Sequence, residues 1–451
     1  MRELSLVPTA VVVWAVSLVV VLTRTGWWAG TGLLAATLIA ALLARRWWPE
    51  IAVAGGAGLG ALIVSWVRIW RADNTHWPTP AHLKVHVDAV TAVGNRDGLW
   101  LITGDSIPFL FTGTPPTTGS TIAVTAAMKA SDRPSVTGVI GTIRQWHLLA
   151  EPTGWARIAG AIHTRYLTAV EWVHHPGARG LIPGMVIGDT SLQTPDNTDL
   201  YTSVGLSHLS AVSGSNVAIV TTACALLVWW ATPRLRIAVA IAALIGYVGI
   251  VGLEPSVLRA AVTGMVGFIA VLSARRAEPI HAVSLAVILL VLWDSDLAVS
   301  YGFALSVVAT AGIVIVSPVF FVPLARTRLP AILVRALAVA IAADITTMPI
   351  VAMMTGQVST VSVLANLCAA PAVAPVTVVG LLAVPLSFLP GHVERVALLG
   401  AEPFAWWIDT VAHAVAQFPL AQVTVPAGVL GWGWVAVVVG WVVWAVLRWG
   451  W

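Results

Sequence analysis

Long apolar runs separated by short polar breaks occupy most of the chain. Three runs come first, at about 7–23, 29–44 and 51–67. Nine more follow residue 205, at about 209–231, 237–253, 257–273, 280–293, 298–322, 331–354, 358–388, 397–416 and 427–447. A helix needs about 20 mostly apolar residues to cross a bilayer, so the pattern predicts an α-helical multi-pass membrane protein with about 11–12 spans.

The run at 358–388 differs from the others because it is long and contains Pro371, Pro375 and Pro385. Proline removes a backbone hydrogen-bond donor and kinks a helix. Irregular backbone inside a membrane is tolerated only where it lines protein or water. We therefore predict a broken or re-entrant element at this run.

Hydropathy falls between residues 75 and 152, where prolines and glycine turns separate short alternating runs such as "HLKVHVDAVTAV" and "GLWLITGDSIPFLFTG". Alternation with period two is typical of half-buried strands. Four to five strands in this length predict a small all-β barrel, with an OB-like arrangement as the candidate.

The stretch that follows the β region has helical periodicity. Over 156–175, Ile158, Ile162 and Tyr166 share one face, which is typical of an interfacial amphipathic helix. Gly, Pro, Asn and Asp turns indicate a linker over 176–204. The predicted domains are 1–72 (three spans), 73–153 (β domain), 154–204 (interfacial helix and linker) and 205–451 (the main membrane domain).

Composition supports the membrane assignment, because 58% of residues are hydrophobic and only 10% are charged. A soluble domain carries about 25% charged residues. The two cysteines do not form a CxxC pair, so neither a disulfide framework nor a zinc site is expected. Neither lysine, Lys84 or Lys129, follows a glycine, which excludes a Walker A loop and ATP hydrolysis by that route.

Arginine pairs occur in alternate loops of the C-terminal half, at 234/236, 275/276 and 326/328, whereas the loops between them have no Lys or Arg. Cytoplasmic loops of membrane proteins are enriched in these residues. We therefore expect a bacterial plasma (inner) membrane protein with a cytoplasmic N-terminus and an extracytoplasmic segment at 73–204.

Polar residues stand at the start of one predicted span, in "HLSAVSGSNVAIV" at 208–220. His208, Ser213 and Asn216 occupy positions where hydrocarbon is expected, and Gly214 loosens the backbone between them. Polar groups inside a membrane are costly and are functional candidates.

A second polar group enters the span that follows, in "LEPSVLRAAVTG" at 253–264. Arg259 lies five residues after Glu254 and needs water or a partner. Two interpretations stay open: an Arg–acid lock with Glu254 or Asp344, or a cargo contact in a pore. Asp344 itself is a candidate proton or cation site, or a helix-locking hydrogen bond.

Two catalytic interpretations are weaker. "AVSG" resembles the segment around the nucleophile of rhomboid-type intramembrane proteases, with Ser213 as nucleophile, but residue 211 is Ala where that family has Gly. The later histidines, His281 and His413, lack the sequence context of a catalytic base. "HLKVHVD" lacks the acid-containing turn of a metal hydrolase.

Four polar segments together resemble one known family. "GLSHLSAVSGSNVAIV" is similar to the "GLxHLLAVSGxHV" signature of the ComEC family, and "PSVLRAAVTG" is similar to its "PSxxRA" motif. "GFALSVVATAGI" resembles "GFxLSFxATxGI", and the Pro, Ser, Asn and Pro order of 349–375 resembles a further segment. The resemblance covers about 180–390 well and the β region loosely.

The resemblance implies an inner-membrane channel that passes single-stranded DNA into the cytoplasm during natural transformation, without enzymatic activity, cofactor or metal. The implied partners are single-stranded DNA, membrane lipid, an outer-face DNA receptor, a cytoplasmic ATPase or helicase, and a separate nuclease. The nuclease is expected to be separate because the metallo-β-lactamase-like domain of many relatives is missing after Trp451. The predicted path residues are His208, Ser213, Gly214, Asn216, Pro255, Ser256, Arg259, Ser306 and Asn366.

Two departures from the family bear on this reading. Asn216 stands where the family has a histidine, so a proton role at that position is not expected. Basic and acidic residues balance over 82–151, so DNA affinity of the β region alone should be modest. The alternative function is a small-molecule transporter or a membrane scaffold in which Asp344 and Arg259 form an intramembrane polar site.

Overall fold

A computed structural model describes residues 6–449 except 27, 29, 33–34, 37–47, 76, 78–79, 93–98 and 273–277. The chain folds into two compact units. Unit 1 comprises Met1–Ala161 and Val262–Ser300, and unit 2 comprises Ile162–Ala261 and Tyr301–Trp451.

Among the described residues, seven helices are long and apolar enough to cross a membrane. They are α3 (Trp48–Asp73), α7 (Gly214–Leu227, with the turn that precedes it), α8 (Pro233–Val251), α11 (Tyr301–Leu324), α12 (Ala331–Thr355), α13 (Ser362–Leu386) and α15 (Val429–Trp449). Three shorter apolar helices are α1 (Val7–Thr23), α9 (Pro255–Leu272) and α10 (Pro279–Trp293). The prediction of a helical multi-pass membrane protein is confirmed.

Two predicted spans have a different outcome. The span at 29–44 lies mostly outside the described residues. The span at 397–416 is the helix α14 (Glu394–Ala416), which is not among the seven apolar helices. Two acidic residues, Glu394 and Asp409, are buried on its packed face.

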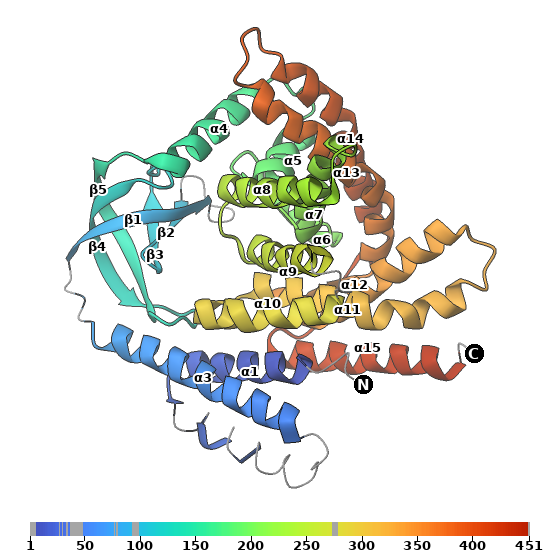
Figure 1. Cartoon of the computed structure of the whole chain (residues 1–451), viewed down its shortest axis with the longest axis horizontal. Helices are drawn as coiled ribbons and strands as arrows, with labels where there is room; N and C mark the ends of the chain where they lie inside the picture. Colours follow the sequence, from blue (N-terminus) through green and yellow to red (C-terminus); the bar gives the residue numbers. More distant parts are fainter. Residues whose placement is uncertain are drawn as a thin grey trace. The chain divides into compact units, whose positions relative to one another are not determined.

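The small β domain is a closed five-stranded barrel in unit 1 (Figure 1). Its strands are β1 (Ala81–Ala92), β2 (Leu99–Gly104), β3 (Ile107–Thr112), β4 (Thr121–Ala130) and β5 (Val139–Ala150), in the order β1-β2-β3-β5-β4. Only β3 and β5 pair in parallel. Alternate side chains such as Val85, Ile102 and Phe109 fill the interior, so the predicted barrel is confirmed.

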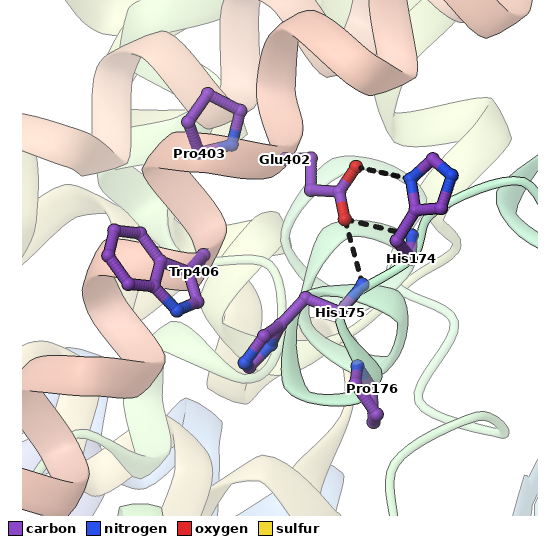
Figure 2. Close-up of a pocket in the computed structure, with 6 residues that line it drawn as sticks. All are labelled: His174, His175, Pro176, Glu402, Pro403 and Trp406. Carbon is purple, nitrogen blue, oxygen red and sulfur yellow. Dashed lines mark hydrogen bonds and ion pairs between the residues drawn. The ribbon is translucent and has the colours of Figure 1, made fainter.

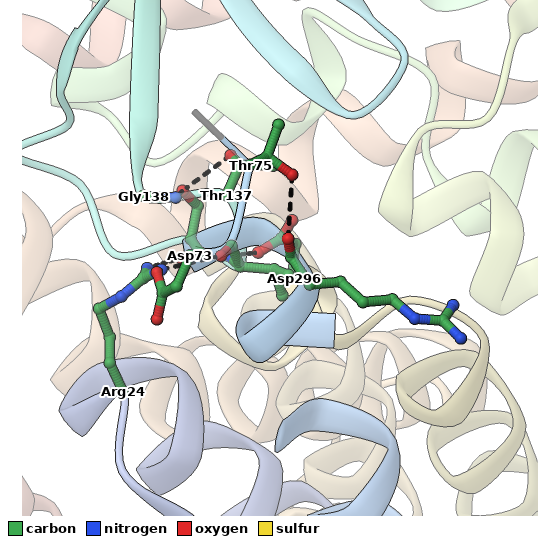
Figure 3. Close-up of polar contacts among 9 residues, drawn as sticks. Arg24, Asp73, Thr75, Thr137, Gly138 and Asp296 are labelled. Atoms are coloured by element: carbon green, nitrogen blue, oxygen red, sulfur yellow. Dashed lines mark hydrogen bonds and ion pairs between the residues drawn. The ribbon is translucent and has the colours of Figure 1, made fainter. Parts of the chain in front are cut away.

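Polar contacts hold the β4–β5 connection against the helices of unit 1. The backbone N–H of Val136 donates to Asp296 in the short helix η4 (Ser295–Val299), with N···Oδ1 2.6 Å. Arg24 after α1 donates to the Ser135 carbonyl and pairs with Asp73 at the end of α3 (Figure 3). Burial raises the pKa of Asp296 to about 6, although the Val136 N–H and nearby arginines act in the opposite direction.

The core of unit 2 contains a helix that the sequence analysis assigned to a linker. After α4 (Gly154–Val170), residues 176–204 form α5 (Pro176–Ile187) and α6 (Pro195–Ser203). All of α5 except Pro176 and Arg179 is buried, mainly against α13 and α14. The linker prediction is wrong because the glycines serve packing: a Cβ on Gly184 would lie 2.2 Å from the Ser210 carbonyl oxygen.

The prediction of a break in 358–388 is also wrong, because α13 runs without interruption through Pro371, Pro375 and Pro385. α13 lies alongside α14 and packs against α5 (Figure 1). Neighbouring helices can compensate for the backbone donors that proline removes. The helix begins beside the middle of α12, since Ser362 contacts Asp344 there.

Candidate functional site

The polar start of the fourth predicted span, before Gly214, is not α-helical. A single 3₁₀ turn, η3 (Ser207–Leu209), precedes α7, which begins only at Gly214. His208 is exposed. Ser213 is the N-cap residue of α7, but its hydroxyl bonds to the Ser215 hydroxyl, with an O···O distance of 2.6 Å, and does not cap the backbone. The α-helix therefore starts after His208 and Ser213, whereas Asn216 lies in its first turn and is buried there.

Arg259 is the centre of a group that we call the arginine cluster, which consists of Gly214, Ser256, Arg259 and Ser306. Arg259 is 8% exposed, and its Nε donates to the Ser306 hydroxyl on α11 at 2.6 Å. The guanidinium also lies against the start of α7, because a Cβ on Gly214 would lie 2.5 Å from Nη2. Glycine at 214 is what allows this approach.

The segment before Arg259 joins α9 to the polar start of α7. Pro255 is the first residue of α9, where its missing N–H costs nothing, and Glu254 precedes it. The Ser256 hydroxyl donates to the Val212 carbonyl at 3.1 Å. Three helices, α7, α9 and α11, thus contribute to the arginine cluster.

Asn216 does not line a surface. It is 1% exposed, and its side-chain amide donates to the Met185 carbonyl of α5 at 3.0 Å. The hydroxyl of Thr377 on α13 donates to its carbonyl oxygen at 3.4 Å. Both ends of the amide are therefore used, and Asn216 holds α7 against α5 and α13.

A second group, the aspartate cluster, consists of Asp344, Ser362, Asn366 and Gly205. The Ser362 hydroxyl donates to Asp344 with an O···O distance of 2.5 Å. Asn366 donates to the Ser362 carbonyl at 2.9 Å and reaches the Gly205 carbonyl at 3.5 Å. The bond between Ser362 and Asp344 connects α13 to α12, and the ion-site role of Asp344 stays a prediction.

Sequence reasoning missed three partners of these groups: Ser362, Thr377 and Met185. The first two are single hydroxyl residues in an apolar run, and their spacing carries no signal of what they contact. Met185 contributes only its backbone carbonyl, which no sequence pattern could reveal.

A histidine–aspartate pair connects α4 to the segment between α5 and α6. His163 on α4 contacts Asp189 with Nδ1···Oδ2 3.3 Å, and its Nε2 lies 2.9 Å from the Ile250 carbonyl. Burial alone would lower the pKa of His163, but the contacts with Asp189 and Ile250 raise it overall. Burial alone would raise the pKa of Asp189, but His163 and Ser191 lower it overall.

The described part of the chain has no group of three or more His, Cys, Asp or Glu residues that could hold a metal ion. The two clusters themselves consist of hydroxyl and amide groups, one arginine and one aspartate. Such groups bind and position polar solutes through hydrogen bonds.

The fold and these clusters define a polytopic membrane protein in which polar side chains meet between apolar helices. Comparison with protein families shows that residues 185–451, more than half of the chain, match the Competence protein family. The chain belongs to this family, whose role is DNA uptake in transformation. No curated protein and no solved structure matches the chain.

Proposed function

We propose that this protein is an inner-membrane channel that passes single-stranded DNA into the cytoplasm during natural transformation. One observation carries the proposal: in a family that serves DNA uptake, separate motifs from three apolar helices place Gly214, Ser256, Arg259 and Ser306 in one cluster. A conduit for a phosphate chain needs donors that bind weakly enough to release it. Hydroxyls beside one arginine meet that need better than a lysine-rich groove.

The path includes the arginine cluster with His208, Ser213, Pro255 and Asn366, and Asn216 secures the helices around it. The arginine pairs in alternate loops support an arrangement with 73–204 outside the cytoplasm and the N-terminus inside. The strand order of the barrel supports an OB-like domain on the outer side. The protein conducts and does not catalyse, so an outer receptor, a cytoplasmic ATPase or helicase and a separate nuclease complete the process.

Substitution of Arg259 by Ala tests the proposal. Transformation should fall to the level of a deletion strain while the protein inserts at its normal amount, because the path loses its only cluster arginine. Arg335→Ala is the matched control, since Arg335 is exposed on α12. Wild-type transformation by Arg259→Ala, at normal protein level, would contradict the channel.

Location of the labelled DNA separates the channel from the alternatives. A small-molecule transporter predicts that labelled DNA still enters cells that carry Arg259→Ala. If the protein is a scaffold, the deletion strain should lose other membrane components together with DNA uptake. Arg259→Ala should then keep both those components and DNA uptake. The channel predicts that DNA binds at the surface in the variant and stays outside.

A further inference from the structure

A pocket in unit 2 lies apart from both clusters, where the start of α5 meets α14 (Figure 2). Its volume is about 500 Å³. The pocket is lined by His174, His175, Pro176, Glu402, Pro403 and Trp406. The wall is thus formed by an indole ring, two proline rings, two imidazoles and one carboxylate.

The carboxylate is fixed by the backbone. Glu402 Oε1 accepts from the N–H groups of His174 and His175, both at 2.8 Å. Oε2 has a longer contact with the His174 ring, at 3.4 Å. Backbone donors at a helix start stabilise the ionised form of a carboxylate. Oε2 has room for a further donor, because each carboxylate oxygen accepts more than one hydrogen bond.

A second carboxylate makes the surroundings more negative. Asp409, about two turns after Glu402 on α14, is 4% exposed and accepts from the Tyr201 hydroxyl at 2.6 Å. The rings of His175 and His413 lie 4.0 Å and 3.4 Å from its Oδ2. The residues that line the pocket include no Lys or Arg. Glu402 at the pocket therefore favours a cation over a phosphate group, although the Arg179 guanidinium bonds to the Val173 carbonyl next to His174.

The indole adds a second preference for a cation. Trp406 is 46% exposed and lies one turn after Glu402 on α14, so the two residues line the same side of the pocket (Figure 2). Ammonium groups bind to the face of an indole ring, and most strongly where they are shielded from water. The proline rings supply apolar surface for the methylene groups next to such an ammonium. Tryptophan is also typical of the lipid headgroup region of membrane proteins.

We propose that this pocket binds the ammonium headgroup of a phospholipid such as phosphatidylethanolamine. The ammonium contacts Glu402 Oε2 and the Trp406 ring, and the phosphate stays outside the pocket. The site is independent of the proposed DNA path, and nothing in the channel proposal requires it. It would tie the packing of α5 against α14 to the lipid composition of the membrane.

The test is native mass spectrometry of the full-length protein, purified in detergent, with phosphatidylethanolamine or phosphatidylglycerol at equal concentration. Phosphatidylethanolamine should be retained in preference. Trp406→Leu should weaken its binding about threefold to tenfold, as expected for a lost cation–π contact. Glu402→Gln keeps the acceptor for the His174 and His175 N–H groups, removes the charge and should weaken binding similarly. Trp441→Leu, at an exposed position of α15, is the matched control and should change nothing.

Equal retention of phosphatidylglycerol would overturn the proposal, as would unchanged phosphatidylethanolamine binding in Trp406→Leu. Excess ethanolamine should displace the lipid. If it does not, and diacylglycerol binds equally well, acyl chains are recognised and the proposal fails. Displacement of the lipid by a short single-stranded oligonucleotide would reassign the pocket to DNA and also overturn it. If Glu402→Gln does not fold, Trp406→Leu decides.

Discussion

Gly214→Ala tests the geometry of the arginine cluster. The added Cβ would lie 2.5 Å from Arg259 Nη2, whereas ordinary contacts begin at 3.4 Å, so the guanidinium must move by the difference, 0.9 Å. A movement of that size directed away from Ser306 stretches the 2.6 Å bond from Arg259 Nε to the Ser306 hydroxyl to the limit of hydrogen bonding, whereas a rotation of the guanidinium end would leave the bond in place. A hydrogen bond to a charged group contributes about 1.5–3 kcal/mol, so we expect a loss of stability of that order. Transformation should fall with it, because the same arginine is moved from its place on the path.

The assay compares thermal unfolding in detergent and transformation frequency at equal protein level. Gly246→Ala on α8 is the control, because a Cβ there meets nothing within 4 Å. In an Arg259→Ala background, Gly214→Ala should cause almost no loss of stability, since the guanidinium group that the new Cβ would meet is absent. The reasoning is refuted if Gly214→Ala behaves like Gly246→Ala, or if its cost is the same with and without Arg259.

Two further predictions concern unit 2. Ser362→Ala removes the donor to Asp344 and should destabilise the protein by about 1–3 kcal/mol, the cost of leaving the half-buried Asp344 carboxyl group without this bond; equal unfolding temperatures for variant and wild type would contradict the bond. His163 has a raised pKa, from an ordinary 6.5, and Asp189 a lowered one, from an ordinary 3.8. The pair should therefore stabilise the protein most between these two values and lose its effect as pH rises above 6.5 through the folded-state pKa of His163, or falls below 3.8 through that of Asp189. Unfolding temperature measured against pH should show the alkaline loss in the wild type and not in His163→Gln; the same slope in both would show that other groups cause it.

Hydropathy and alternation were sufficient for the membrane class and for the barrel. Both patterns are local properties of the sequence. Contact with lipid requires a continuous apolar run in a membrane helix, and solvent on one face requires polar residues at alternate positions of a strand. Of the predicted path residues, Arg259 lies against Gly214 and bonds to Ser306, and Ser256 bonds to the nearby Val212 carbonyl; their role on a path stays a prediction.

The errors arose where one residue type serves two purposes. Glycine and proline in 176–204 indicated turns, whereas in α5 the glycines admit a neighbouring backbone at close range. The prolines of α13 indicated a break, but packing on α14 and α5 keeps the helix continuous. Asn216 was assigned to the path because composition cannot show which way a side chain faces, and it turns into the core.

Passage of the DNA strand beside the arginine cluster can be tested by site-specific crosslinking during uptake. A photo-crosslinking amino acid is placed at position 213, whose side chain caps no helix, and a control is placed at position 437, which is exposed on α15. Cells are illuminated while labelled DNA enters. We predict crosslinks to single-stranded DNA from position 213 and none from position 437. Undiminished DNA entry with no crosslink from position 213, or equal crosslinking from both positions, would contradict the account.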